Sequence, residues 1–372
     1  MGGSAKTDAG AAYIFYRNQG GTNNWGQVKK ITGKGTNGRV AGDNFGVSVS
    51  ISGDYLAVGA HKQDYDSAGA TAKTDAGAVY IFHRNSGGTD NWGIQKKRTG
   101  VGTNARLASD NFGYHVSLSG STLAVGAYNH DYDSAGASVK ASAGAVFVYY
   151  KDQGGVSSWG QVKKITPSGT NNRVGSDFLG FRVCLQSDYL VVGAYGQDYD
   201  SAGANSRTTA GAAFVFSRNQ GGADKWGQVK KLSARGTNAR VASDQFGINV
   251  GVSGNNILVT ANLQDYDNVG ANAKADAGAG YIYYVGSNFS QVTKITEQDP
   301  YYAVASDNYG TSVSIDGDYA AVGSPLQDYD SLGANSVSAA GAVYIYYREE
   351  GGSDAWGLAK KNSTTRYKFE GG

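Results

Sequence analysis

The stretch Asn44–Arg84, NFGVSVSISGDYLAVGAHKQDYDSAGATAKTDAGAVYIFHR, decides the fold because variants of it recur along the chain. The tripeptide Asp-Tyr-Asp (DYD) begins at Asp64 and returns at steps of 67, 67, 67 and 63 residues. A Phe-Gly-like pair keeps the same steps, beginning at Phe45, Phe112, Leu179, Phe246 and Tyr309. Two separate markers with one period indicate an internal repeat, which must be recognised before any other pattern.

Each copy predicts four short strands. In residues 45–52, Val and Ile alternate with Ser, which is the period of a strand with one packed face. Gly53 and Asp54 then form a two-residue hairpin signal that requires positive φ. YLAVGA follows as the second strand, and a loop carries DYD. GAVYIFHR, rich in β-branched and aromatic residues, is the third strand, and WGIQKKR is the fourth.

Four strands per repeat are the signature of a β-propeller, in which stacked sheets bury one another's faces. The Ser-, Gly- and Val-rich first strand suits the crowded centre, and the fourth strand, with Lys29 and Lys30 or Lys96 and Lys97, suits the solvated rim. We therefore expect an all-β fold, a β-propeller of four-stranded blades with about 67 residues per repeat. It would form a single domain over residues 1–372, with a partial repeat at 1–32 and repeats at 33–99, 100–166, 167–233, 234–296 and 297–363.

The sequence does not divide into a whole number of repeats. The sequence starts inside a copy, at AKTDAGAAYIFYRN, so third-strand segments outnumber first-strand segments by one. This predicts six blade positions with five complete copies, or seven blades when missing or partner strands complete the ring. The ring can hold an incomplete blade, the sequence can be cut from a longer protein, or the N-terminal hairpin can pair with another chain. Arg366–Glu370 is a candidate for one further strand.

Composition limits the partners. The net charge of the 372 residues is +2 and the basic residues form no run, which argues against nucleic acid. The sequence has no apolar run of about 18 residues, so no membrane span is expected. Cys184 is the only cysteine, which excludes an intrachain disulfide. It stands at the repeat position of Ser50 and Ser117, so we expect a small buried residue there.

Three segments that recur in order, NFGVSVSISGDYLAVGA, AGAVYIFHR and NWGIQKK, resemble the FG-GAP repeat family, most closely its bacterial-type subgroup. The resemblance runs from Asp8 to Lys361. It implies a β-propeller like the head of integrin α subunits, extracellular or cell-surface placement, and an adhesive or ligand-binding role. Integrin-type repeats carry a calcium loop between the first two strands. Here only Ser52–Tyr55 stands in that place, which is too short to wrap an ion, so that site does not carry over.

The DYD loops are the sharpest candidate site. Two carboxylates at i and i+2, then Ser or Asn and a Gly, resemble half of a calcium loop, and calcium takes six to eight oxygens. The alternatives are carboxylates that only cap turns and direct ligand contact. A further acid, Asp75 or Asp276, follows in two copies, whereas the others have Ser142, Thr209 and Ala339. The possible calcium ligands are Asp64, Asp66, Asp131, Asp133, Asp198, Asp200, Asp265, Asp267, Asp328 and Asp330.

A second acid recurs just before each Phe-Gly pair. We interpret this acid as structural, either an ion pair with an arginine four residues earlier in four copies or a turn cap. A ring of acids lining the mouth of a cation channel is the alternative. These structural acids are Asp43, Asp110, Asp177, Asp244 and Asp307, and the arginines are Arg39, Arg106, Arg173 and Arg240.

The sequence shows no catalytic constellation. The four histidines occupy different repeat positions without metal-ligand spacing, and no nucleophile elbow or phosphate-binding loop is present. We therefore expect a non-enzymatic extracellular or cell-surface adhesion or ligand-binding propeller, with a protein or glycan partner. The alternative is a structural subunit of a self-assembling extracellular filament or matrix, which would associate with other copies through its unpaired N-terminal hairpin.

Overall fold

The computed structural model describes residues 5–297, 304–330, 333 and 336–363. Within these residues every regular element is a strand except a short 3₁₀ turn, η1 (Val285–Ser287). The chain divides into two compact units. The first comprises Met1–Gly169, Arg173–Leu190 and Phe216–Gln228, and the second comprises Thr170–Asn172, Val191–Val215 and Val229–Gly372.

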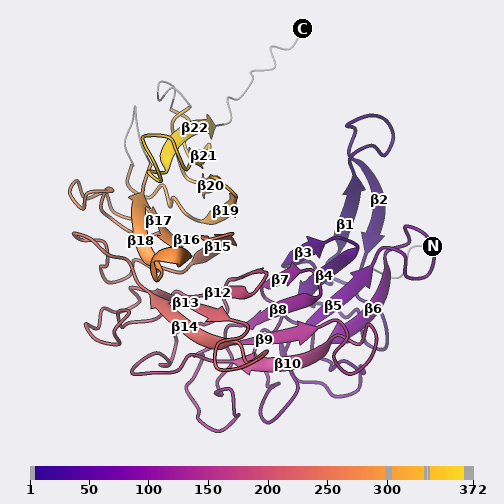
Figure 1. Cartoon of the computed structure of the whole chain (residues 1–372). Helices are drawn as coiled ribbons and strands as arrows, with labels where there is room; N and C mark the ends of the chain where they lie inside the picture. Colours follow the sequence, from indigo (N-terminus) through magenta and orange to yellow (C-terminus); the bar gives the residue numbers. More distant parts are fainter. Residues whose placement is uncertain (1–4, 298–303, 331–332, 334–335, 364–372) are drawn as a thin grey trace. The chain divides into compact units, whose positions relative to one another are not determined.

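The strands form one two-stranded and five four-stranded sheets in the described part of the chain (Figure 1). The first sheet is β1 (Ala12–Tyr16) with β2 (Gly26–Ile31). The five others are β3 (Val49–Ser52), β4 (Tyr55–Ala60), β5 (Ala78–His83) and β6 (Gly93–Arg98); β7 (Val116–Ser119), β8 (Thr122–Ala127), β9 (Ala145–Tyr150) and β10 (Gly160–Ile165); β11 (Val183–Gln186), β12 (Tyr189–Ala194), β13 (Ala212–Ser217) and β14 (Gly227–Leu232); β15 (Asn249–Ser253), β16 (Asn256–Ala261), β17 (Ala279–Tyr284) and β18 (Ser290–Ile295); and β19 (Ser312–Asp316), β20 (Tyr319–Ser324), β21 (Ala342–Tyr347) and β22 (Gly357–Ser363).

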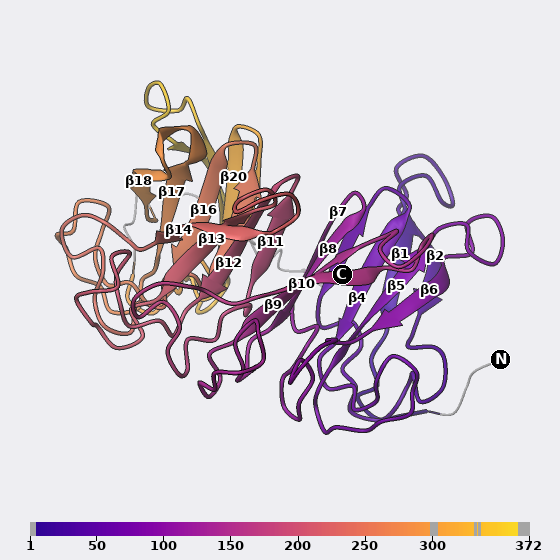
Figure 2. The same cartoon turned by 60° about the horizontal axis from the view of Figure 1, so that its bottom comes forward.

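This architecture confirms the predicted all-β fold, with repeated four-stranded blades, six blade positions and five complete copies. The strands of a blade follow one another in sequence order and lie side by side, as β4, β5 and β6 do in Figure 2. Ser52 pairs directly with Tyr55, and Gly53 has a φ of +55°. The predicted tight turn is therefore present. The proposed strand at Arg366–Glu370 lies outside the described residues.

In four of the five copies the Phe-Gly-like pair begins with an aromatic residue, which packs in the core of its own blade. The ring of Phe45 lies 5.3 Å from that of Tyr80 and 6.2 Å from that of Phe82, both edge-on. Edge-to-face contacts of this kind are the preferred geometry of aromatic pairs. The buried hydroxyl of Tyr80 donates to the carbonyl of Gly38 at 2.7 Å. Phe45, which precedes the inner strand, thus packs against the third strand, and Tyr80 of that strand binds the inter-blade connection.

The serine face of the inner strand is the contact between successive sheets. Ser50 Oγ accepts from the backbone N–H of Leu118 at 2.9 Å, and Ser48 and Ser52 do the same for Val116 and Gly120. In β7 the apolar residues are buried as predicted. In β3 the prediction of one packed apolar face is wrong, because Val49 and Ile51 lie exposed where no inner strand precedes them.

Two further expectations need correction. Lys30 is exposed as expected, but Lys97 is not at a solvated rim, because it is 7% exposed and its ammonium lies over the ring of Tyr80 at 5.7 Å. Its aliphatic stem packs, and its ammonium interacts electrostatically with the buried acid Asp43. Cys184 is half-buried rather than buried, because the serine face on which it lies is only partly covered.

Candidate functional site

The second acid of each DYD loop caps the loop. Asp66 Oδ1 accepts from the backbone N–H groups of Ala68 and Ala70, both at 3.0 Å, and Oδ2 accepts from Thr71 at 3.1 Å. The bond from Ala70, with the others, lowers the pKa of Asp66 to about 2 because these donors favour the charged carboxylate. Asp133, Asp200 and Asp267 accept from the N–H groups two and four residues later in the same way.

The first acid closes the other end of the loop. Asp64 Oδ1 accepts from the backbone N–H of Asp75 at 2.9 Å. In the other four copies the matching N–H belongs to Ser142, Thr209, Asp276 and Ala339. All five donors have φ near +50°. The position therefore contributes its backbone, which explains why its side chain varies between copies.

These contacts bear on the calcium hypothesis. The DYD carboxylates point their oxygens at N–H donors, whereas a calcium ion needs six to eight oxygens turned towards it. Among the described residues, no three His, Cys, Asp or Glu side chains group so that they could hold a metal. The carboxylates in this arrangement fit turn caps and do not form a calcium shell. Calcium binding by these loops stays a prediction.

The acid before each Phe-Gly pair is buried in a polar network. Asp244 Oδ2 accepts from Val241 N at 2.5 Å and from Gln264 Nε2 at 3.0 Å. Lys294 Nζ donates to Gln264 Oε1 at 3.0 Å. Burial raises the pKa of Asp244 to about 7 and lowers that of Lys294 to about 8. The other four acids are at most 3% exposed and each accepts from the N–H three residues earlier: Asp43, Asp110, Asp177 and Asp307.

The third sheet carries a histidine in this network. His130, fully buried, stands where the other copies have glutamine, and its Nδ1 lies 2.9 Å from Asp110 Oδ1. Its Nε2 lies 3.5 Å from Lys164 Nζ. The imidazole spans the same acid and lysine that the glutamine amide joins elsewhere, so it fills a structural position.

The arginine four residues before each acid reaches a different partner. The guanidinium of Arg106 donates to the carbonyl oxygen of Asp64, and those of Arg173 and Arg240 reach Asp131 and Asp198 in the same manner. Each arginine thereby ties a connection to the DYD loop of the preceding copy. The acids and arginines are thus both placed at the joint between copies, but through separate contacts.

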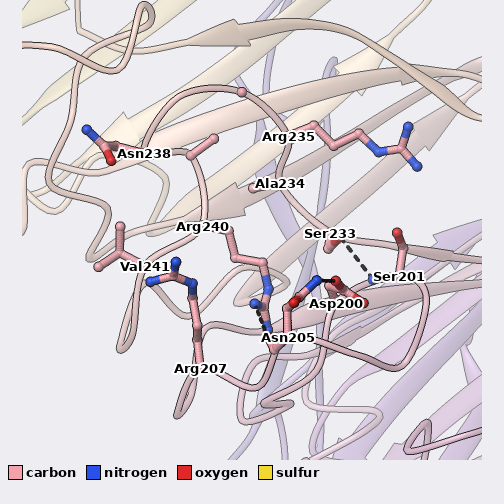
Figure 3. A pocket seen from close by; sticks show the side chains of 12 residues that line it. Asp200, Ser201, Asn205, Arg207, Ser233, Ala234, Arg235, Asn238, Arg240 and Val241 are labelled. Carbon is pink, nitrogen blue, oxygen red and sulfur yellow. Dashed lines mark hydrogen bonds between the residues drawn. The ribbon is translucent and has the colours of Figure 1, made fainter.

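A polar pocket lies in the second unit, where one DYD loop meets the connection that follows β14 (Figure 3). We call it the arginine pocket. It has a volume of about 460 Å³, and its lining includes Asp200, Asn205, Arg207, Ser233, Arg235 and Arg240. Arg207 and Arg240 lie near Asn205, while Arg235 extends from the opposite wall. The carboxylate of Asp200 is occupied by backbone N–H groups and by Asn205 Nδ2 at 2.7 Å.

The face of the first sheet is the largest departure from the repeat. Trp25 is 60% exposed, whereas its counterpart Trp92 is 3% exposed and donates to Tyr16 Oη at 2.9 Å. Tyr13 and Phe15 are about half exposed, although Tyr80 and Phe82, one repeat later, are buried. In the described residues β1 hydrogen-bonds to β2 alone. We call Tyr13, Phe15 and Trp25 the aromatic face.

The last sheet has an open counterpart. In five sheets a glycine before the third strand makes a parallel bridge to the next Phe-Gly-like pair, for example Gly77 to Phe112. A Cβ on the equivalent Gly341 would find Pro325 O, at 3.3 Å, as its nearest described atom. A cavity of about 470 Å³ lies there, lined by residues that include Gly323, Gly341, Ala342 and Val343. We call it the FG slot.

Repeated four-stranded sheets, joined by Phe-Gly turns and acid-capped loops, define the class of this protein as a β-propeller. The FG-GAP repeat family matches residues 25–82, 106–149, 159–216 and 289–346, which is more than half of the chain. The chain belongs to the FG-GAP repeat family. This family is generally non-catalytic, and its repeats are typical of extracellular β-propellers.

The chain resembles solved structures only distantly. The chain is similar to the computationally designed Ika8 protein at 9% identity and a TM-score of 0.40, covering 85% of this chain and 60% of that one. It is similar to Sqt1 of Saccharomyces cerevisiae at 10% identity and a TM-score of 0.42, covering 86% and 63%. The chain thus spans less than two thirds of the length of either structure. No curated protein matches it significantly, and none of the helical turns in the described residues could cross a bilayer.

The sequence pointed to the DYD loops and to the unpaired N-terminal hairpin, but it missed the arginine pocket and the FG slot. The pocket has a signal in the repeat alignment, because Arg235 stands where the second and third copies have Val101 and Ser168. A groove in the first unit, about 390 Å³, lies instead between Val101 and the following DYD loop, and its lining includes Lys163 and Lys164. Comparing copies for charge, as well as for shared motifs, would have found the arginine pocket.

Proposed function

We propose that this chain is a non-enzymatic extracellular protein-binding propeller, which takes up a strand pair from a partner chain at its open faces. The observation that carries the proposal is the aromatic face. Trp25 is 60% exposed, and each of its tryptophan counterparts is at most 3% exposed. Contiguous exposed aromatic surface is typical of interaction sites, and aromatic residues dominate binding hot spots.

The chain itself indicates what would cover these faces. In the second sheet, Phe45 packs edge-on against Tyr80 and Phe82, which occupy the positions of Tyr13 and Phe15. A Phe-Gly turn with its strand would therefore cover the aromatic face. The FG slot accepts the same element, since Gly278 in the fifth sheet bridges Tyr309 there. Both faces, each within its own unit, fit a partner that carries an FG-type strand pair.

A synthetic peptide with the sequence of residues 44–60 is a suitable probe. We expect it to bind the wild-type chain, and the double variant Phe15→Ser, Trp25→Ser to bind it at least tenfold more weakly. The control is Val156→Ser, since Val156 is a loop residue that is 89% exposed away from this face. Equal binding by the double variant would contradict a role for the aromatic face, provided that thermal melting shows both variants folded.

Self-assembly is the second candidate function, supported by the free edge of β1. An unpaired strand edge is a template for pairing with another chain. Two copies would then join through β1, with the aromatic faces buried at the joint. Light scattering and electron microscopy test this directly: assemblies that disappear in the Phe15→Ser, Trp25→Ser variant support it, and a wild-type monomer at high concentration argues against it.

A further inference from the structure

The arginine pocket differs in charge from the same positions in two other copies. Its lining contains three arginines and one aspartate. The residue that matches Arg235 is Val101 in the second copy and Ser168 in the third, and it is Lys34 in the first. The residue that matches Arg207 is a lysine in the first, second and fourth DYD loops, at Lys73, Lys140 and Lys274. The local excess of guanidinium is thus a feature of one copy and not of the repeat.

The positive charge of the pocket is only partly balanced within the protein. The oxygens of Asp200 accept hydrogen bonds from Ala202, Ala204 and Asn205. No carboxylate lies within 4 Å of the guanidinium nitrogens of Arg207, Arg235 or Arg240 in the described part of the chain. Burial lowers the pKa of Arg240, and Asp200 attracts its charge while Arg207 repels it. With three arginines and one aspartate, the lining keeps an excess of positive charge that an anion would balance.

The framework of the pocket is fixed before any ligand arrives. Ser201 N donates to Ser233 Oγ at 3.1 Å, which joins the DYD loop to the connection after β14. The backbone of Arg235 exchanges two hydrogen bonds with the amide of Gln291, both 2.9 Å long. Arg240 donates to the carbonyl of Asn205 at 2.8 Å. Preorganised groups bind with a smaller entropic cost than mobile ones.

From this geometry we infer that the arginine pocket is a binding site for the sulfate or carboxylate group of an acidic sugar. Planar guanidiniums bind such oxyanions in a bidentate manner. The hydroxyls of Ser201 and Ser233 and the amide of Asn205 lie beside the arginines and suit the hydroxyl groups of a sugar ring. The pocket holds about 460 Å³, enough for one sulfated monosaccharide unit, and it opens to solvent so that a longer chain can pass.

The test is isothermal titration calorimetry of the full chain with a sulfated heparin-type disaccharide at low salt. We expect saturable binding that weakens with added salt, because the contacts are partly exposed. Arg207→Gln and Arg235→Val should each weaken it about tenfold, the loss expected for one charge-assisted hydrogen bond. Arg235→Val also gives this position the residue that the second copy has there, Val101.

Lys163→Gln is the control, because it removes one positive charge from a groove of the first unit that is separate from the arginine pocket. It should leave binding unchanged. Equal weakening by Lys163→Gln would show that only overall charge matters and would overturn the site. Tighter binding of a polyglutamate peptide than of the disaccharide would overturn the choice of a sugar. Binding of the desulfated disaccharide with equal strength would overturn the role of the oxyanion.

This site and the proposed strand uptake are separable. The arginine pocket shares no residue with the aromatic face or the FG slot. The peptide of residues 44–60 should bind Arg207→Gln as it binds the wild type, and the Phe15→Ser, Trp25→Ser variant should retain the disaccharide. Each proposal can therefore fail while the other stands.

Discussion

Gly77 lies directly against the backbone of Phe112, so closely that a Cβ on Gly77 would fall 2.0 Å from the Phe112 carbonyl oxygen. The φ of Gly77 is +86°, which also favours glycine. The FG turn of one sheet thus packs directly against a glycine of the preceding sheet. The same relationship recurs at four other bridges and explains why Phe-Gly and Ala-Gly keep one spacing along the chain.

Gly77→Ala should therefore destabilise the protein strongly. The added methyl group meets backbone atoms that cannot move aside, and overpacking of this kind costs about 3 kcal/mol. The matched control is Gly341→Ala in the FG slot, where φ is +78° and the nearest described atom would be 3.3 Å away. That variant should lose only about 1 kcal/mol for the left-handed backbone. Urea unfolding measures the free energy of unfolding of both variants. Equal losses would contradict the close packing of the FG turn against Gly77.

The repeat period, the strand order and the tight turn could all be predicted, because alternation and Gly-Asp signals are local. Three features could not, because each depends on contacts between copies. The alternation in the inner strand predicts a packed apolar face, but it does not reveal that Ser50 bonds to the next sheet. The pattern places Lys97 at the rim, but Lys97 is buried over the ring of Tyr80. Asp64 and Asp66 read as possible metal ligands, but their partners are N–H groups.

The buried acid Asp244 should make stability depend on pH. Its folded pKa is about 7, raised from an ordinary value near 3.8 by burial. The folded state therefore binds the proton more tightly, and this contribution is complete below about 3.8 and is lost as the pH rises through about 7. The free energy of unfolding of the wild type, relative to Asp244→Asn, should fall by on the order of 2 kcal/mol or more between pH 4 and pH 8.

Urea unfolding of both proteins across that range is the measurement. Lys294 does not produce the effect, because its pKa of about 8 keeps it charged over most of the range. Asp66→Asn is the control variant, since the pKa of Asp66 is held near 2 and titrates below the range. A constant difference between wild type and Asp244→Asn would show that Asp244 is ionised in the folded protein throughout.

The DYD loops allow a test that separates capping from calcium binding. Asp66→Ala removes the acceptor of three backbone N–H groups, so it should lower the free energy of unfolding by about 1–2 kcal/mol. If capping is the role, this loss persists in the presence of EDTA. The calcium hypothesis makes a different prediction: EDTA lowers the melting temperature of the wild type, and Asp66→Ala abolishes that response. Ser67→Ala, in the same loop, serves as the control.

The joint between sheets can be tested at a single hydroxyl. Ser50 Oγ accepts from Leu118 N at 2.9 Å, and Leu118 is buried. Ser50→Ala leaves that N–H without its acceptor, which should cost about 1–3 kcal/mol. Ser50→Cys, the residue that Cys184 provides at the same position in the fourth sheet, should cost less, because sulfur is a weak acceptor of the right size. Amide hydrogen exchange at Leu118 should accelerate in Ser50→Ala and much less in Ser50→Cys. Unchanged exchange in Ser50→Ala would mean that the adjoining strands protect Leu118 without the serine. Tight packing between the inner strands would then not depend on the hydrogen bonds of the serine face.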